Sequence, residues 1–167
     1  MTTESSLQLF RSLAEVPAGF GPTVAAIGNF DGVHLGHQRI LSAVIADARS
    51  IGARAVAITF EPHPERFLRP AQAPVLLTPL DERLRLLSLT GIDAVLVLPF
   101  DAALACLPAR QFVQRVLIET LSVRGLHEGG NFRFGHNAEA GATELLNFAA
   151  EFGFGLQIHP PVKTHGL

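Results

Sequence analysis

The stretch Ile27–Leu41, IGNFDGVHLGHQRIL, decides how this 167-residue chain folds. The apolar run Thr23–Ile27 leads into it, and a segment of helical period, His37–Ser50, follows. An apolar run that passes through a glycine-containing turn into an amphipathic helix is typical of the first β–α junction of a parallel sheet. The packing of a hydrophobic core requires neither Gly-Asn-Phe-Asp-Gly nor two histidines on either side of a glycine. The junction is therefore the first candidate for a functional site.

The same alternation of strands and helices continues along the chain. Apolar runs that suit strands buried on both faces are Ala53–Phe60, Ala94–Leu98, Val123–His127 and Gly155–Ile158. Helical patterns lie between them at Thr78–Gly91, Pro108–Leu121 and Ala140–Phe152. This order predicts an α/β fold, a Rossmann-like, doubly wound and mainly parallel sheet, in a single domain over residues 1–167. Such sheets bind ligands at the carboxyl ends of their strands.

Three further expectations concern single residues or segments. Pro79 and Pro108 are expected at the first position of their helices, where proline is favoured. The Pro-rich segment Glu61–Pro74 is expected to be the one long loop. Cys106 is expected to be a small, buried apolar residue.

Composition and charge exclude several classes of protein. Apolar residues make up 48% of the chain, which argues against disorder, and the formal net charge is only -2. General affinity for nucleic acid or for anionic membranes is therefore not expected. One cysteine allows neither an internal disulfide nor a cysteine-based zinc cage, and no apolar stretch approaches the roughly 20 residues that span a bilayer. We expect a soluble cytoplasmic protein that binds small molecules, without an obligate protein partner.

The loop after the first predicted strand has the composition of a phosphate site. Gly28 and Gly32 let the backbone turn tightly and approach a ligand. His34 and His37 lie three residues apart near the start of the helix, so they share one face, and Gly36 leaves room between them. A helix N-terminus favours anions, and imidazole N–H groups donate to phosphate oxygens. The pattern favours phosphoryl or nucleotidyl transfer by positioning and electrostatics.

Two plainer interpretations of the histidine pair stay open. His-x-x-His is also half of a metal site, although no nearby cysteine or well-spaced third ligand completes it. The pair also fits an ordinary βα turn with two surface histidines. The chain contains no G-x-x-x-x-G-K-[ST] and no G-x-G-x-x-G, so it has neither a P-loop nor a dinucleotide-binding fingerprint.

The junction resembles a known signature. Gly28-x-Phe30-Asp31-x-x-His34-x-Gly36-His37 resembles the His-x-Gly-His motif of a nucleotidyltransferase superfamily, in which both histidines contact the ATP phosphates. TFEPHP, Thr59–Pro64, and GGNFRFGH, Gly129–His136, follow the second and fourth predicted strands. Together the three segments resemble the motifs of the bacterial FAD synthetase (FMN adenylyltransferase) module, and the resemblance runs from about Val24 to the end of the chain. That module is usually the N-terminal half of a bifunctional riboflavin kinase/FMN adenylyltransferase.

The resemblance implies an ATP:FMN adenylyltransferase of the HxGH nucleotidyltransferase type, which makes FAD and pyrophosphate from FMN and ATP with Mg²⁺. His34 and His37 would then be the catalytic residues. The residues implied in ATP or phosphate binding are Gly28, Asn29, Phe30, Asp31 and Gly36. The residues implied in flavin binding are Phe60, His63, Phe132, Arg133 and Phe134. Asn131 would supply a neutral oxygen to Mg²⁺.

The side chains of the second and third motifs suit such a site, and each also has a plainer interpretation. Phe132 and Phe134 offer aromatic faces to a flavin ring, with the Arg133 guanidinium between them, but either phenylalanine also fits a core anchor. The other structural alternatives are an Arg133–Glu128 ion pair, a solvated Glu61 and a His63 that caps the Pro-rich turn.

Three departures from the family pattern shape the functional expectation. Family members continue into a Ser/Thr-rich segment that ends in Arg, and bifunctional members into a riboflavin kinase half; neither follows VKTHGL here. NAEAGATE also replaces the usual basic residues after the third motif. We therefore expect a C-terminally truncated part of a longer enzyme. The alternatives are a non-catalytic module that binds flavin or ATP, and a nucleotidyltransferase with another acceptor.

Overall fold

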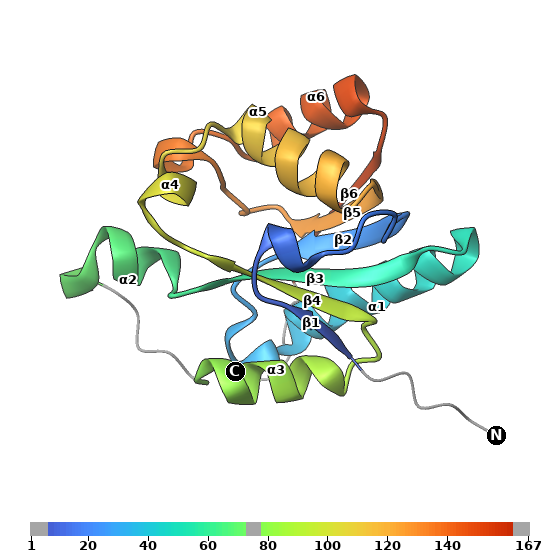
Figure 1. Ribbon diagram of the computed structural model, residues 1–167, viewed down its shortest axis with the longest axis horizontal. Helices are drawn as coiled ribbons and strands as arrows, with labels where there is room; N and C mark the ends of the chain where they lie inside the picture. Colours follow the sequence, from blue (N-terminus) through green and yellow to red (C-terminus); the bar gives the residue numbers. More distant parts are fainter. Residues whose placement is uncertain (1–6, 73–77, 162–167) are drawn as a thin grey trace.

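A single parallel sheet organises the computed structural model, which describes residues 7–72 and 78–161 (Figure 1). Within these ranges six strands run in the order β1-β4-β3-β2-β5-β6, and every pairing is parallel. The strands are β1 (Gln8–Phe10), β2 (Thr23–Ile27), β3 (Arg54–Glu61), β4 (Ala94–Pro99), β5 (Val123–Gly129) and β6 (Gly155–His159). The predicted doubly wound α/β fold is confirmed.

Helices connect these strands. The α-helices are α1 (Leu35–Ile51), α2 (Pro64–Leu68), α3 (Leu80–Ser88), α4 (Ala102–Ala105), α5 (Ala109–Phe112) and α6 (Ala142–Phe152). α5 continues into a π-helix, η4 (Val113–Thr120), and single 3₁₀ turns are η1 (Leu13–Glu15), η2 (Asp31–Val33), η3 (Pro70–Gln72) and η5 (His136–Ala138). No helix in the described ranges combines the length and the apolar character that crossing a membrane requires.

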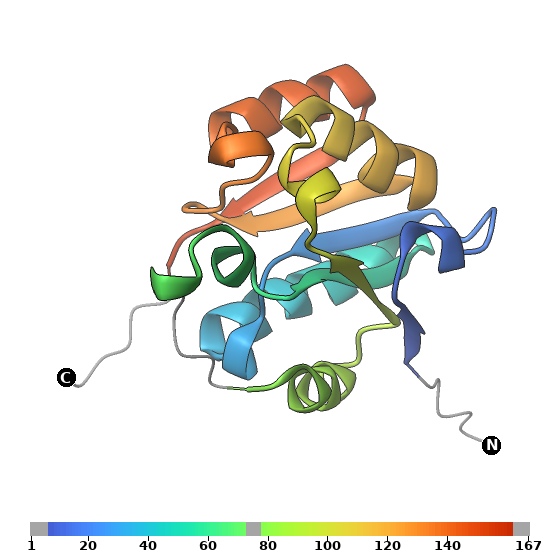
Figure 2. The same ribbon diagram turned by 60° about the vertical axis from the view of Figure 1, so that its left-hand side comes forward.

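Both faces of the sheet are covered, which explains why the strands are continuous apolar runs. α1 and α3 lie on one face, and α5, η4 and α6 lie on the other (Figures 1 and 2). Successive residues of β2 alternate between the two layers: Val24 and Ala26 pack with the α1 and α3 side chains, and Ala25 and Ile27 pack toward α5, η4 and α6. All five residues of β2 are buried. Each layer thus has its own apolar core.

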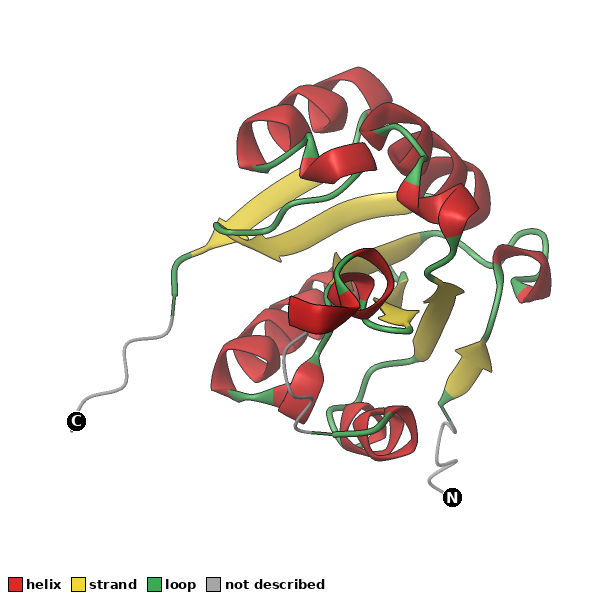
Figure 3. Cartoon of the chain, turned by 90° about the vertical axis from the view of Figure 1, so that its left-hand side faces the viewer, coloured by secondary structure: helices red, strands yellow, loops and turns green. Residues whose placement is uncertain are grey.

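The strand order places a topological switch point beside β2. The chain moves from β2 to β3 and β4 in one direction, and then returns to β5 on the other side of β2. Connections that leave in opposite directions open a crevice at the carboxyl ends of the two central strands. Figure 3 looks onto this edge of the sheet. The loop after β2, which carries the histidine pair, lies at this crevice.

The structure corrects several local expectations. The first strand, Gln8–Phe10, was not predicted. The segment expected to be one long loop contains α2 and η3, and its last two residues, 73 and 74, lie outside the described ranges. Pro79 and Pro108 are N-caps, one position before the helices they were expected to start. Cys106 is exposed, because it ends the short helix α4 at the surface.

Candidate active site

His34 is held at the start of α1 by its own helix. As the N-cap of α1, it accepts hydrogen bonds at Nδ1 from the backbone N–H groups of Gly36 (3.1 Å) and His37 (3.4 Å). Nδ1 therefore carries a lone pair, and the proton of the neutral ring is on Nε2. The exposed ring thus offers one N–H donor to a ligand. Nδ1 of His34 thus binds two N–H groups at the start of α1, where the sequence predicted that phosphate binds.

His37 stacks against His34 and is largely enclosed. The ring centroids lie 3.5 Å apart with planes 20° from parallel, and Phe30 meets His37 edge-on at 5.2 Å. Burial, helped by the neighbouring His34 and opposed by Asp31, lowers the pKa of His37 to about 4. His37 is therefore neutral at pH 7 in the free protein. Its Nδ1 is enclosed and has no hydrogen-bond partner among the described residues.

The rest of the loop after β2 is fixed by a short polar bridge to the segment before α3. The Asp31 carboxylate accepts hydrogen bonds from the Thr78 N–H (2.9 Å) and hydroxyl (3.0 Å). The same hydroxyl accepts from the N–H of Gly32 at 3.1 Å. Phe30, in the left-handed region at φ 52°, is buried under the loop. Asp31, expected to bind phosphate, thus braces the loop.

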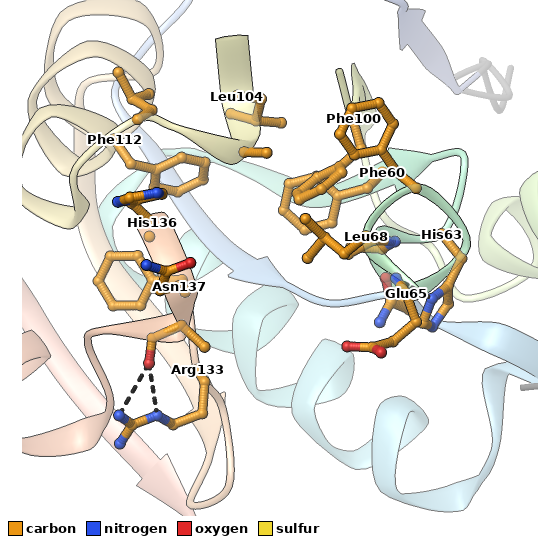
Figure 4. A pocket seen from close by; sticks show the side chains of 18 of the residues that line it. Phe60, His63, Glu65, Leu68, Phe100, Leu104, Phe112, Arg133, His136 and Asn137 are labelled. Atoms are coloured by element: carbon orange, nitrogen blue, oxygen red, sulfur yellow. Dashed lines mark hydrogen bonds between the residues drawn. The ribbon is translucent and has the colours of Figure 1, made fainter. Parts of the chain in front are cut away.

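A first cavity of about 650 Å³ opens on one side of this loop. Its walls are largely apolar and include six phenylalanines, and two groups of side chains face one another across it (Figure 4). Phe60 and Phe100 meet edge to face at 5.9 Å on one wall, whereas Phe132 stacks on Phe134 at 5.5 Å and 11° on the other. An apolar slot of this size suits a flat aromatic ligand. The residues predicted to bind flavin all line it: Phe60, His63, Phe132, Arg133 and Phe134.

Several of these residues also have structural partners. Phe134 is buried in the core beneath α5 and α6, as the plainer alternative proposed. His63 is the N-cap of α2, because its Nδ1 accepts from the N–H of Glu65 at 3.1 Å. The Arg133 guanidinium donates to the carbonyl oxygen of Ala138 at 3.0 and 3.2 Å. The suggested pair of Arg133 with Glu128 is wrong.

Glu128, near the end of β5, has a buried side chain. It is 2% exposed and accepts a hydrogen bond from the N–H of Ile27. Burial raises the pKa of this carboxyl well above its ordinary value, and the hydrogen bond from Ile27 only partly opposes the rise. Burial thus favours the protonated form of Glu128, which lies at the edge of a second cavity.

The second cavity, of about 690 Å³, lies over the start of α1 and the ends of β2, β5 and β6. His34, Gly36 and His37 line it together with Phe30 and Gly28. Three residues line both cavities: Gly28, Asn131 and Phe132. Asn29 lines the first cavity, and Asp31 lines neither of the two. Two cavities that share lining residues are suited to a reaction between two ligands.

This chain matches the FAD synthetase family over residues 17–167. The chain belongs to the FAD synthetase family. It is 35% identical over 161 residues to the bifunctional riboflavin kinase/FMN adenylyltransferase of Pseudomonas fluorescens, covering 96% of this chain and 51% of that protein. It is 38% identical over 131 residues to the bifunctional riboflavin kinase/FMN adenylyltransferase of Escherichia coli strain K12, covering 78% and 42%. The chain thus spans about half the length of the curated relatives it matches.

Two solved structures resemble this chain in fold. A Streptococcus pneumoniae protein described as a macrolide-efflux protein superposes with a TM-score of 0.80 at 25% identity, covering 95% of this chain and 52% of that one. Pantoate-beta-alanine ligase from Francisella tularensis, complexed with beta-gamma ATP and beta-alanine, superposes with a TM-score of 0.62 at 11% identity. That likeness covers 96% of this chain and 69% of the ligase.

No role was predicted from the sequence for Arg83, which supports the candidate site. Arg83 on α3 is 2% exposed, and its guanidinium donates to the carbonyl oxygens of Asn29 (2.8 Å) and Phe60 (3.2 Å). It also pairs with the Glu61 carboxylate at 3.1 Å, so Glu61, for which a solvated acid was one alternative, has a buried cation as partner while its own side chain stays 39% exposed. The sequence did contain a signal for this role: Arg83 lies on the inward face of an amphipathic helix, four residues before the buried Leu87.

Proposed function

We propose that this chain transfers the adenylyl group of ATP to FMN and forms FAD and pyrophosphate. The observation that carries the proposal is the pair of cavities that meet at Gly28, Asn131 and Phe132. ATP occupies the second cavity, over the start of α1, and FMN occupies the aromatic first cavity. Their phosphates then meet at the shared wall. Membership of the FAD synthetase family supports the assignment of both ligands.

The two stacked imidazoles hold the triphosphate. The Nε2–H of His34 points away from the cap that orients its ring, and it donates to a phosphate oxygen. The neutral ring of His37 stacks directly on His34, and its Nδ1 has no hydrogen-bond partner among the described residues. Donors placed beforehand where negative charge grows on phosphate oxygens stabilise the transition state. Arg39 on the same cavity wall adds a positive charge.

The aromatic cavity holds the flavin. The Phe132 ring, stacked on Phe134, and the Phe60–Phe100 wall offer two apolar faces to the isoalloxazine ring. Because Phe132 also lines the second cavity, a ring that stacks on this wall carries its phosphate toward the reacting centre. The buried Arg83 supports the opposite wall, since it holds the ends of β3 and of the histidine loop together.

Two amide side chains, one at the shared wall and one beside it, fit Mg²⁺. Asn131 is exposed and lines both cavities, and the amide oxygen of Asn29 is enclosed without a hydrogen-bond partner in the described part of the chain. Mg²⁺ accepts few protein ligands and completes its shell with phosphates and water. When bound, it would neutralise charge on the phosphates. The described residues contain no cluster of three His, Cys, Asp or Glu that suits a metal, so the His-x-x-His pair finds no such partners.

The reaction itself needs no covalent intermediate with the protein. An oxygen of the FMN phosphate attacks the α-phosphorus of ATP in line, a new P–O bond forms, and the bond from that phosphorus to the bridging oxygen breaks. Pyrophosphate leaves with the electron pair of that bond. A phosphate dianion is already a nucleophile, so no general base is required. The protein contributes position and charge stabilisation.

Replacing His37 by alanine tests the proposal. We expect the rate of FAD formation, followed by chromatography and by pyrophosphate release, to fall about 10²–10³-fold. FMN binding, followed by quenching of flavin fluorescence, should stay within a factor of about two because the aromatic cavity is intact. Ser42→Ala, an exposed position on the same helix and outside both cavities, is the control.

Two results would contradict the proposal. Full turnover by His37→Ala would remove the phosphate role of the histidine pair. Tight binding of FMN and ATP to the wild-type chain, with no pyrophosphate released, would establish the non-catalytic module instead. A single domain over residues 1–167, a cytoplasmic location and the lack of an obligate protein partner stay predictions.

A further inference from the structure

A chain of three polar side chains lies beside the second cavity and has no part in the mechanism above. Asp47 on α1 contacts His127 on β5, with 3.0 Å between Oδ2 and Nε2. Nδ1 of His127 in turn lies 2.9 Å from Nε2 of His159, the last residue of β6. His127 is 3% exposed and His159 is 8% exposed. His159 lines the cavity, whereas Asp47 and His127 do not.

The sheet register brings these residues together. His159 is paired with Gly129, and His127 lies two residues before Gly129 on the same strand, so both histidines project from the same face of the sheet. α1 covers that face and supplies Asp47. Gly125, two residues before His127, makes room for the carboxylate, because a Cβ there would lie 2.9 Å from Asp47 Oδ2. The chain of contacts is therefore built into the fold.

The carboxylate fixes which nitrogen of each ring carries a proton. An ionised Asp47 only accepts hydrogen bonds, so Nε2 of His127 is the protonated nitrogen. In a neutral His127, Nδ1 is then an acceptor, and Nε2 of His159 must donate to it. Nδ1 of His159 is left with a lone pair. This nitrogen has no hydrogen-bond partner among the described residues. It is also not among the buried polar atoms without a partner, so a ligand can reach it.

The charge state of His159 agrees with this assignment. Burial first, and then the neighbouring His127 and Arg39, lower the pKa of His159. The ring is therefore neutral at pH 7, with one donor nitrogen and one acceptor nitrogen. Because the donor is committed to His127, a ligand in the cavity meets the acceptor only.

His159 lies where the base of a nucleotide fits. The triphosphate of ATP lies on His34 and His37 in the proposed function, and the α-phosphorus lies at the wall shared with the first cavity. The lining of the second cavity that is not shared with the first includes Ile40, Pro160 and Pro161, which offer apolar surfaces to a purine. His159, next to Pro160, belongs to the same lining.

We propose that His159 accepts a hydrogen bond from the 6-amino group of adenine, and that Asp47, acting through His127, keeps His159 in the accepting tautomer. The inference rests on the proposed function, since it places ATP in the second cavity. Adenine carries an amino donor at position 6, whereas guanine carries a carbonyl acceptor there. A lone pair that faces the guanine carbonyl leaves two buried acceptors unpaired. His159 is thus a specificity-determining residue, and His127 and Asp47 are positioning residues.

Equilibrium binding of four nucleotides to the 167-residue chain tests the proposal without relying on catalysis. The probes are ATP, GTP, purine riboside triphosphate, which lacks the 6-amino group, and 2′-deoxy-ATP, each titrated calorimetrically with Mg²⁺ present. We expect ATP to bind about 10-fold more tightly than GTP and about 5-fold more tightly than purine riboside triphosphate. We expect 2′-deoxy-ATP to bind like ATP.

The variant Asp47→Asn tests whether Asp47 fixes the tautomer of His159. An asparagine amide either donates to or accepts from His127, so it no longer fixes the protons of the two rings. The ratio of ATP to GTP affinity should fall about 5-fold, toward one, although the substituted side chain lies outside the cavity. Asp81→Asn, the same change at an exposed position of α3, should keep the wild-type ratio. His159→Leu should abolish the preference for ATP over purine riboside triphosphate, and it serves if Asp47→Asn does not fold.

The possible outcomes separate this inference from the proposed function. An unchanged ATP to GTP ratio in Asp47→Asn and an unchanged preference in His159→Leu would overturn the inference alone. Equal affinity of the wild-type chain for ATP and for purine riboside triphosphate would also overturn it, because the 6-amino group would then contribute nothing to binding. No binding of any nucleotide to the wild-type chain would overturn the proposed function as well.

Discussion

The guanidinium of Arg83 donates a hydrogen bond to the carbonyl oxygen of Asn29, 2.8 Å away, and so joins α3 to the loop that carries the histidine pair. The same group reaches the carbonyl of Phe60 and the carboxylate of Glu61. Burial lowers the pKa of Arg83, and Glu61 and Asp31 oppose the shift. One buried cation therefore sets the relative position of the β2 and β3 ends, which carry residues of both cavities.

Arg83→Met should destabilise the fold by about 2–4 kcal/mol, because two buried carbonyl groups lose a donor. Urea unfolding measures this difference. Arg85→Met on the same helix is the matched control, since Arg85 is largely exposed and pairs with Glu82 at the surface. Exposed pairs of this kind contribute little, so its unfolding midpoint should stay close to that of the wild type. Equal losses in both variants would mean that the buried contacts of Arg83 do not support the site.

The low pKa of His37 should make the fold sensitive to acid. The folded protein binds this proton only near pH 4, whereas an unfolded histidine binds it near 6.5. The stabilising contribution of His37 is thus fully present above about pH 6.5 and is lost as the pH falls toward 4. The loss amounts to up to about 3 kcal/mol.

His37→Gln should therefore lose less stability than the wild type between about pH 6.5 and pH 4. Unfolding free energies measured across this range give the comparison, and a proton NMR titration of the ring reports its pKa directly. Bound triphosphate should raise that pKa, because a nearby anion favours the charged ring. A ring that titrates near 6.5 in the free protein would contradict the prediction.

Glu128 should give the opposite pH dependence. The pKa of this carboxyl is higher in the folded protein than in the unfolded chain, where it is about 4.5, so the wild type loses stability as the pH rises beyond that value. Glu128→Gln keeps an oxygen that accepts from the Ile27 N–H, and its stability relative to the wild type should grow from about pH 5 to about pH 8.

Glu128→Leu separates the hydrogen bond of this side chain from its ionisation. Leucine leaves the Ile27 N–H buried without an acceptor, which should destabilise the fold by about 1–3 kcal/mol at pH 5. Thermal unfolding of the three proteins in a series of buffers provides the data. A Glu128→Gln curve that stays parallel to the wild type at every pH would show that the carboxyl ionises in the fold.

Gly135 in the third motif should tolerate no side chain. Its φ is +83°, and a Cβ there would lie 2.7 Å from the Cβ of Ala109 and 2.9 Å from its backbone. Gly135→Ala combines left-handed strain with this overlap, and should destabilise by about 2–4 kcal/mol. Gly52→Ala is the control, because Gly52 has φ +70° but no atom within 4 Å of a Cβ, so only about 1 kcal/mol of strain remains. Equal unfolding midpoints for both variants would contradict the close approach of η5 to α5.

The sequence predicted those elements whose determinants are local. β2 and β4 are readable as apolar runs because both of their faces are buried. β1 was missed because it has three residues, two of them exposed, and exists through its pairing with β4, more than 80 residues away. The helix in the Pro-rich segment was missed although His63 and Pro64 form a local start signal for it.

The candidate site was predictable to the same extent. The histidine pair and the aromatic third motif were found because their residues are close in sequence. Arg83 and the Asp47–His127–His159 chain were not found, since their partners come from elements tens of residues apart and are brought together by register and packing. A single sequence shows where polar residues are, but contact between distant ones depends on the completed sheet.

The wall that Gly28, Asn131 and Phe132 form between the cavities has a consequence for the end of the catalytic cycle. A dinucleotide made across it keeps the contacts of both halves, and two linked fragments bind far more tightly than either one alone. In the proposed reaction, FAD would block the entry of both substrates at once, and it would leave only after both of its halves have dissociated. Release of the product, rather than the chemical step, would then limit the rate of turnover, and accumulated FAD would inhibit its own formation.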